Sequence, residues 1–169
     1  MVPNVAGLRP TTNRVRETLF NWLQFDIKNS RCLDVCAGSG ALGFEALSRG
    51  AESAHFVEMD AQALAMIKKN AHHLGVNLNE HVFVHQADAQ SFLSKNTSIE
   101  PFDFVFVDPP FELKIHAEIF NALLENGCLS EKALVYCEMP SKELIELPSN
   151  WTWHRQKSYK NVTFGLIAV

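Results

Sequence analysis

The sequence predicts an α/β fold with an open, seven-stranded, mostly parallel sheet and an antiparallel C-terminal edge. Strand-like and helix-like segments alternate four times between residues 32 and 126, a pattern typical of parallel β-α units. A fifth strand-like run follows, and two β-rich runs around Lys160 and Asn161 close the chain. The last two runs read as a hairpin, and hairpin strands are antiparallel.

The first expected element is a helix over about residues 12–25, because threonines precede apolar residues at helical spacing. The four strand and helix pairs are expected at 32–35 with 41–48, 54–59 with 61–74, 82–85 with 89–95, and 102–107 with 114–126. The fifth strand is expected at 133–138 and the hairpin within 151–169. No long linker interrupts this order, so residues 1–169 are expected to form a single domain.

The composition bounds the functional classes. Fifteen Lys and Arg against nineteen Asp and Glu give a net charge of −4, which argues against a surface wholly devoted to nucleic acid but allows a local basic patch. The four cysteines have no zinc-type spacing, so we expect free thiols and no metal site. No apolar run approaches the ~20 residues of a membrane span. We therefore expect a cytoplasmic protein without a membrane segment.

A glycine-rich loop follows the first strand. Gly38, Gly40 and Gly43 have the G-x-G-x-x-G spacing and open a helix, with Ala37 and Ser39 between the strand and the second glycine. Glycine permits a sharp turn and close approach to a ligand, and the helix N-terminus offers free N–H groups. The loop therefore predicts a nucleotide-type ligand.

Acidic residues at the strand ends narrow the choice of nucleotide-type ligand. Asp34 stands beside the loop, where a carboxylate would repel a pyrophosphate but suit the ammonium and sulfonium groups of S-adenosylmethionine. Glu58 could accept hydrogen bonds from the ribose hydroxyls of S-adenosylmethionine or of a dinucleotide. Asp88 could accept a hydrogen bond from adenine while Ala89 offers its N–H to the ring, although a helix N-cap is the alternative for Asp88. The two roles can coexist.

The tetrapeptide Asp108-Pro109-Pro110-Phe111 directly follows the fourth predicted strand. Two prolines cannot continue a sheet, and they hold the preceding carbonyl groups away from helical pairing. Asp108 and the Pro109 carbonyl could then accept hydrogen bonds from a substrate amine, with Phe111 stacked on the ring that carries it. We expect catalysis by positioning and electrostatics rather than by a strong base.

The chain resembles the RsmD-type 16S ribosomal RNA (guanine-N2)-methyltransferases. The matching segments are residues 8–23, 33–51, 57–60 and 106–111. The resemblance implies a class I S-adenosylmethionine-dependent methyltransferase fold, which is Rossmann-like, and methylation of the N2 amine of one guanine in 16S rRNA. It also implies RNA presented on small-subunit ribosomal particles and S-adenosyl-L-homocysteine as the product. We expect the enzyme to be a monomer.

The same resemblance implies the site residues. The catalytic ones are Asp108, Pro109, Pro110 and Phe111. The cofactor-binding ones are Thr11, Thr12, Arg14, Asp34, Ala37, Gly38, Ser39, Gly40, Gly43, Glu58, Met59, Asp88 and Ala89. The chain departs from the family pattern by lacking a basic segment before Arg9, which predicts weakened RNA affinity, and by carrying Asn13 where Asp is usual.

Two other functions are consistent with the residues alone. An amino methyltransferase acting on DNA or protein glutamine shares the Pro-Pro-aromatic pattern, and a non-catalytic adenosine-nucleotide or NAD-binding module would share the glycine loop. S-adenosylhomocysteine and NAD, offered separately, distinguish the second of these from a methyltransferase.

Overall fold

The computed structural model describes residues 13–95 and 99–169, so the predicted contacts of Thr11 and Thr12 lie outside the described residues. The strands are β1 (Arg31–Val35), β2 (Ser53–Glu58), β3 (Val82–Gln86), β4 (Phe102–Val107), β5 (Leu129–Pro140), β6 (Thr152–Tyr159) and β7 (Val162–Ala168). The helices are α1 (Asn13–Trp22), α2 (Ala41–Ser48), α3 (Ala61–Leu74), α4 (Ala89–Lys95), α5 (His116–Glu125) and the short 3₁₀ helix η1 (Phe111–Leu113).

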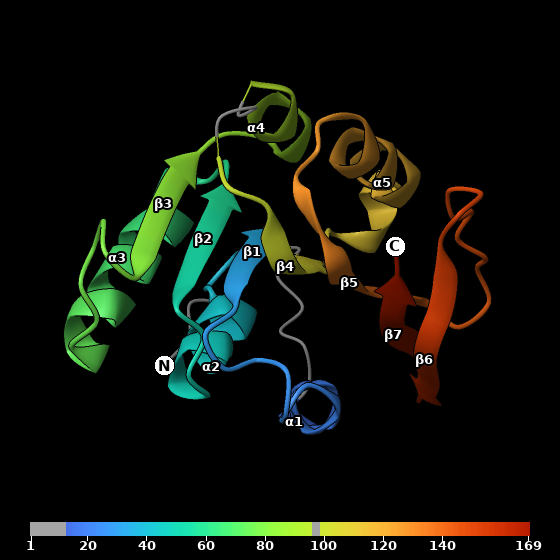
Figure 1. Cartoon of the computed structure of the whole chain (residues 1–169), viewed down its shortest axis with the longest axis horizontal. Helices are drawn as coiled ribbons and strands as arrows, with labels where there is room; N and C mark the ends of the chain where they lie inside the picture. Colours follow the sequence, from blue (N-terminus) through green and yellow to red (C-terminus); the bar gives the residue numbers. More distant parts are fainter. Residues whose placement is uncertain (1–12, 96–98) are drawn as a thin grey trace.

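All seven strands form one sheet in the order β3-β2-β1-β4-β5-β7-β6 (Figure 1). The first five strands of this order pair in parallel. β7 is antiparallel to both β5 and β6 and closes the chain as a hairpin. The predicted mostly parallel, seven-stranded sheet with an antiparallel C-terminal edge is thus confirmed.

The helices cover both faces of the sheet and bury two apolar clusters. Apolar residues of α1, α2 and α3 pack with Phe56, Phe106 and Tyr136 on one face. Residues of α4 and α5 pack with Val107 and Cys137 on the other. Successive side chains of a strand point to opposite faces, so continuously apolar strands fill both layers, as expected for parallel strands covered by helices.

The ends of two elements differ from prediction. α1 ends at Trp22 rather than near residue 25, although Leu23 and Ile27 are fully buried. The Asp26 N–H donates to the Leu23 carbonyl at 2.9 Å, so a turn continues the apolar spacing after the helix has ended. β5 begins at Leu129 rather than residue 133, because Leu129 already pairs with Phe102 of β4 before a register shift, and the polar residues that follow it carry no strand pattern.

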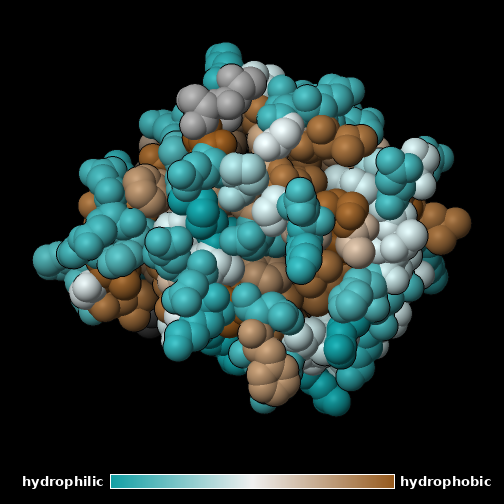
Figure 2. Space-filling view, in the orientation of Figure 1, coloured by the Kyte–Doolittle hydropathy of each residue, from teal (hydrophilic) through white to brown (hydrophobic). Residues whose placement is uncertain are grey.

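Hydrophilic side chains surround hydrophobic atoms near the middle of the face shown in Figure 2. Exposed apolar atoms are normal on folded proteins.

Within residues 13–95 and 99–169, every helix is too short or too polar to cross a bilayer.

α2 packs unusually closely on β2. A Cβ atom built on Gly43 would lie 2.4 Å from the ring of Phe56, and Phe56 is itself fully buried. Real Cβ atoms do not approach other heavy atoms so closely, and dense cores do not accommodate extra atoms freely. Gly43 therefore sets the distance between β2 and α2, the helix that follows the glycine loop.

We predict that Gly43→Ala destabilises the protein by about 1–2 kcal/mol, because overpacking typically costs about 1–3 kcal/mol and outweighs the gain in helix propensity of about 1 kcal/mol. Urea unfolding measures the change. In a Phe56→Leu background, which removes the ring edge, the same substitution should be neutral or stabilising. An equal loss in both backgrounds would contradict this explanation.

Candidate active site

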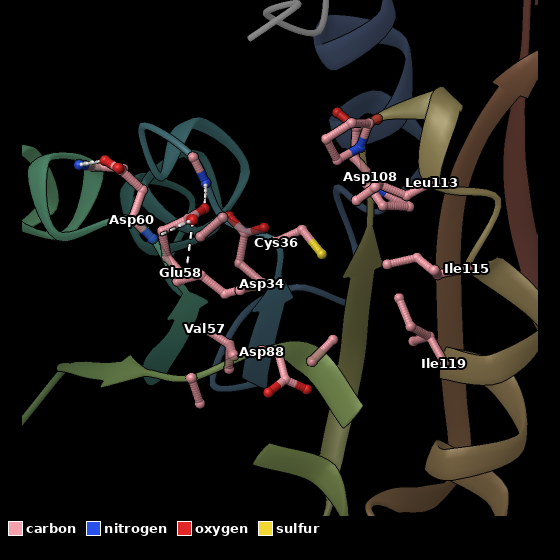
Figure 3. A pocket seen from close by; sticks show the side chains of 18 of the residues that line it. Asp34, Cys36, Val57, Glu58, Asp60, Asp88, Asp108, Leu113, Ile115 and Ile119 are labelled. Carbon is pink, nitrogen blue, oxygen red and sulfur yellow. Dashed lines mark hydrogen bonds between the residues drawn. The ribbon is translucent and has the colours of Figure 1, made fainter. Parts of the chain in front are cut away.

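A cavity of about 660 Å³ lies at the carboxyl ends of the parallel strands. In Figure 3, acidic side chains from β1 and β2 lie on one side, and Asp108 with apolar residues of the β4–α5 segment lies on the other. Twelve of the residues expected to form the site line this cavity: Asp34, Ala37, Gly38, Ser39, Glu58, Met59, Asp88, Ala89, Asp108, Pro109, Pro110 and Phe111.

The parallel register brings these residues together. Val35 at the end of β1 pairs with Val57 on β2 and with Val107 on β4. The three strands therefore end at one level, and the segments that follow them face a common space. Ligands of open α/β sheets bind at this edge of the sheet.

Glu58 ties the glycine loop to the end of β2. The N–H of Gly38 donates to Glu58 Oε2 at 2.8 Å, while those of Met59 and Asp60 donate to Oε1 at 2.8 and 2.9 Å. Gly38 has φ of 53°, a left-handed conformation that favours glycine. A carboxylate has about four acceptor positions, so a ribose diol would share Glu58 with these backbone groups.

Asp34 is a buried acid at the cavity, only 3% exposed. Burial, with a smaller contribution from the charge of Glu58, raises the pKa of its carboxyl to about 7 against the opposing effect of a hydrogen bond from the Gly43 N–H. That N–H donates to Asp34 Oδ2 at 3.1 Å. An approaching cation would favour the ionised form of this carboxyl.

Cys36 also lines the cavity, between Asp34 and the glycine loop. Burial, together with the charges of Glu58, Asp34 and Asp108, raises the pKa of its thiol to about 12. The reactive form of cysteine is the thiolate. Cys36 therefore remains a thiol at neutral pH and is a poor nucleophile.

Asp88 and Asp60 both cap helices. Asp88 Oδ1 accepts from the Ser91 N–H at 2.8 Å at the start of α4, and Asp60 caps α3 through the Ala63 N–H at 2.8 Å. The N-cap alternative for Asp88 is thus confirmed. Its contact with adenine stays a prediction, and its place in the cavity lining is compatible with both roles.

The Asp-Pro-Pro-Phe segment leaves the sheet directly after β4. Pro109 is buried, Asp108 and Phe111 are half-buried, and Phe111 opens η1. The Pro110 carbonyl accepts from the Leu113 N–H at 3.0 Å. Figure 3 shows Leu113, Ile115 and Ile119 on this side of the cavity, so an apolar wall stands opposite the acids of β1 and β2.

Three residues expected at the cofactor lie outside the cavity lining. The guanidinium carbon of Arg14 lies 4.8 Å from the centre of the Tyr159 ring. Gly40 begins α2 with φ of 78°, and Gly43 packs on Phe56. Gly40 and Gly43 thus affect the loop through backbone conformation and packing on the sheet. Cofactor contacts of all three residues stay predictions.

The sequence reasoning did not single out Glu138, which lines the cavity near the end of β5. Its carboxyl is 6% exposed and accepts a hydrogen bond of 2.7 Å from the Tyr136 hydroxyl. An acidic residue at the carboxyl end of an otherwise apolar strand was the available signal. Among the described residues, no group of three or more His, Cys, Asp or Glu is arranged to hold a metal ion.

The family model described as "Conserved hypothetical protein 95" matches residues 1–168. Ribosomal RNA small subunit methyltransferase D of Escherichia coli K12 is 45% identical over 98% of this chain and 81% of that protein. Its Haemophilus influenzae namesake is 41% identical, covering 98% of this chain and 85% of that protein. The chain therefore belongs to the family of these ribosomal RNA small subunit methyltransferases. The predicted resemblance to the RsmD-type methyltransferases is therefore confirmed.

Solved structures support the same family fold. One from Escherichia coli is 42% identical, covers 95% of this chain and 88% of that chain, and superposes with a TM-score of 0.85. Another, complexed with S-adenosylhomocysteine, covers 96% of this chain and 50% of that chain with a TM-score of 0.76. At 15% identity, the second shows the fold alone. The predicted class I methyltransferase fold is confirmed.

The raised pKa of Asp34 predicts a pH dependence of stability. The folded protein holds this proton between the ordinary pKa of 3.8 and about 7, where the unfolded chain releases it. The stabilisation is therefore present below about pH 4 and is lost as pH rises through about 7. From pH 5 to 8, the ligand-free wild type should lose on the order of 2–3 kcal/mol relative to Asp34→Asn.

Urea unfolding of both proteins at the two pH values measures this difference. The matched control is Asp26→Asn, because Asp26 is exposed; that pair should show no comparable change. A constant difference between wild type and Asp34→Asn across this range would contradict the raised pKa.

Proposed function

We propose that this chain transfers a methyl group from S-adenosylmethionine to the N2 amine of a guanine in 16S rRNA. The observation that carries the proposal is that one cavity contains both the acid-flanked glycine loop and the Asp-Pro-Pro-Phe segment. The names of the family relatives favour ribosomal RNA over DNA or protein glutamine. Family membership likewise favours a methyltransferase over an NAD-binding module.

The lining of the cavity fits S-adenosylmethionine. Its acidic groups suit a cationic ligand, and Gly38 removes the side chain where the loop would meet it. We assign Asp34 and the loop to its methionine end, Glu58 to its ribose, and Met59, Asp88 and Ala89 to its adenine. The bound cofactor supplies an electrophilic methyl group, and these residues orient it toward the β4 side of the cavity.

The segment after β4 binds the amine in this proposal. Asp108 and the Pro109 carbonyl accept the two N–H groups of the guanine amine, and Phe111 stacks on the base. These contacts draw the nitrogen toward a tetrahedral shape and aim its lone pair at the methyl group. Asp108 receives the proton that the amine releases on methylation. Pro109 and Pro110 hold the two acceptors in place by restricting the backbone.

The substrate is proposed to be RNA on small-subunit particles, methylated by a monomeric, cytoplasmic enzyme. The target base must leave its stack to reach Phe111, which costs a few kcal/mol that RNA contacts offset. The edge strand β6 exposes basic side chains that suit phosphate, among them Arg155 and Lys157. These contacts would compensate for a net charge of −4.

We predict that S-adenosylhomocysteine raises the melting temperature of this protein and that NAD does not. A ligand that binds only the folded state at a hundred times its Kd stabilises by about 2.7 kcal/mol. The acids beside the loop favour the ammonium group of the first ligand and repel the pyrophosphate of the second. Thermal unfolding with each ligand measures the difference, and stabilisation by NAD alone would overturn the methyltransferase assignment.

We further predict that Asp108→Ala and Phe111→Ala each lower methyl transfer about 100-fold or more, because both residues position the amine. Stabilisation by S-adenosylhomocysteine should be largely retained. Tritiated methyl transfer to small-subunit particles lacking the modification, compared with duplex DNA, measures activity. Phe25→Ala is the matched control, because Phe25 is 86% exposed and outside the cavity lining.

The Escherichia coli relative, 45% identical to this chain, serves as the positive control for the particles. Preferential methylation of duplex DNA would overturn the proposed substrate. An equal loss of cofactor binding in both variants would show that the amine site has been misplaced.

A further inference from the structure

Glu138 is a buried acid at the cavity that the proposed transfer steps do not use. It lies on β5, which is otherwise apolar from Ala133 to Met139, and it is 6% exposed. Fully buried acidic residues are uncommon because removing a carboxyl group from water is costly. A buried carboxyl that lines a ligand cavity is therefore a candidate for contact with the ligand.

The position of Glu138 is held from three directions. The Tyr136 hydroxyl donates to Oε1 at 2.7 Å, and Nε2 of His116 donates to the Glu138 carbonyl at 2.9 Å. In the sheet, Glu138 pairs with Phe164 of β7. A group held in this way presents its carboxyl to a ligand without first having to become ordered.

Glu138 is the neighbour of Asp108 across the sheet. Val107 pairs with Cys137 in the parallel register of β4 and β5, so Asp108 and Glu138 are the next residues on adjacent chains. Burial raises the pKa of Tyr136, and the charges of Glu138 and Asp108 raise it further. Tyr136 therefore keeps its proton, and its hydroxyl continues to donate a hydrogen bond to Glu138.

Two neighbouring acids match one edge of guanine in particular. On that edge the N2 amine stands beside N1–H, so two adjacent positions both donate hydrogen bonds. In adenine and cytosine, the ring nitrogen beside the exocyclic amine is an acceptor. A carboxyl group facing that nitrogen attracts guanine, but it places acceptor against acceptor with the other two bases.

We propose that Glu138 accepts the N1–H of the target guanine while Asp108 holds the N2 amine, so that Glu138 selects the base. Tyr136 is its positioning residue, since it orients the Glu138 carboxyl without touching the base. The inference rests on the proposed function and adds to it the group that distinguishes guanine from other amine-bearing bases.

The test compares guanine with 2-aminopurine at the methylated position. 2-Aminopurine keeps the exocyclic amine at carbon 2 but has an acceptor at N1. The modified position is first mapped in 16S rRNA methylated by the wild type, and a ligated segment then introduces either base. Both RNAs are assembled into small-subunit particles, and kcat/KM is measured for wild type and Glu138→Gln.

Wild type should prefer guanine by about tenfold to a hundredfold, which is the range expected for one hydrogen bond to a charged group. Glu138→Gln should reduce that preference at least tenfold, because its amide can donate to the N1 acceptor of 2-aminopurine. The lost O6 of 2-aminopurine affects both proteins alike and cancels in the ratio. Tyr136→Phe should give a smaller reduction in the same direction.

Glu118→Gln is the matched control, since Glu118 is an exposed acid on α5 at the same cavity; it should keep the wild-type preference. A melting shift with S-adenosylhomocysteine verifies that each variant is folded. If Glu138→Gln does not fold, the base preference of Tyr136→Phe provides the test instead. An unchanged preference in the folded variants would overturn base selection by Glu138. Failure of the wild type on guanine RNA would instead overturn the proposed function on which this inference rests.

Discussion

The parallel register of β1, β2, β4 and β5 is the constraint on which the candidate site depends. Pairing of Val35 with Val57 and Val107, and of Val107 with Cys137, brings the ends of β1, β2 and β4 to one level beside Cys137 of β5. Residues distant in sequence then line one cavity without needing a long loop to reach it. The close packing of Gly43 on Phe56 keeps α2 near β2 and so fixes the end of the glycine loop, where α2 begins.

The same register concentrates acidic groups. Asp34, Glu58, Asp108 and Glu138 all line the cavity, an arrangement that is unfavourable unless hydrogen-bond donors or cations compensate it. Backbone N–H groups compensate Glu58, and the Tyr136 hydroxyl donates to Glu138. A cavity of this kind favours cationic and donor-rich ligands and disfavours phosphates. S-adenosylmethionine and the amine edge of guanine have the favoured chemistry, which accounts for the pairing of these two reactants in one site.

Much of this architecture could be predicted from local patterns, because buried strands and amphipathic helices differ in periodicity and the glycine loop has a distinctive spacing. Interactions between segments distant in sequence could not be predicted in this way. The hydrogen bond from the Gly38 N–H to Glu58 depends on how the glycine loop folds back, and the stacking of Arg14 on Tyr159 joins opposite ends of the chain. An acid at the end of an apolar run was a weak signal for Glu138, because its proximity to Asp108 arises from the pairing of β4 with β5 and not from its neighbours in sequence.

In the proposed reaction, the cavity brings a methyl donor to the N2 amine of guanine. The most direct measurement is mass spectrometry of nucleosides after the protein, S-adenosylmethionine and unmodified small-subunit particles have reacted and the RNA has been digested. We expect N2-methylguanosine as the new nucleoside, absent when the Asp108→Ala variant replaces wild type. A methyl group found instead on adenine, on cytosine or on another atom of guanine would contradict the proposed reaction.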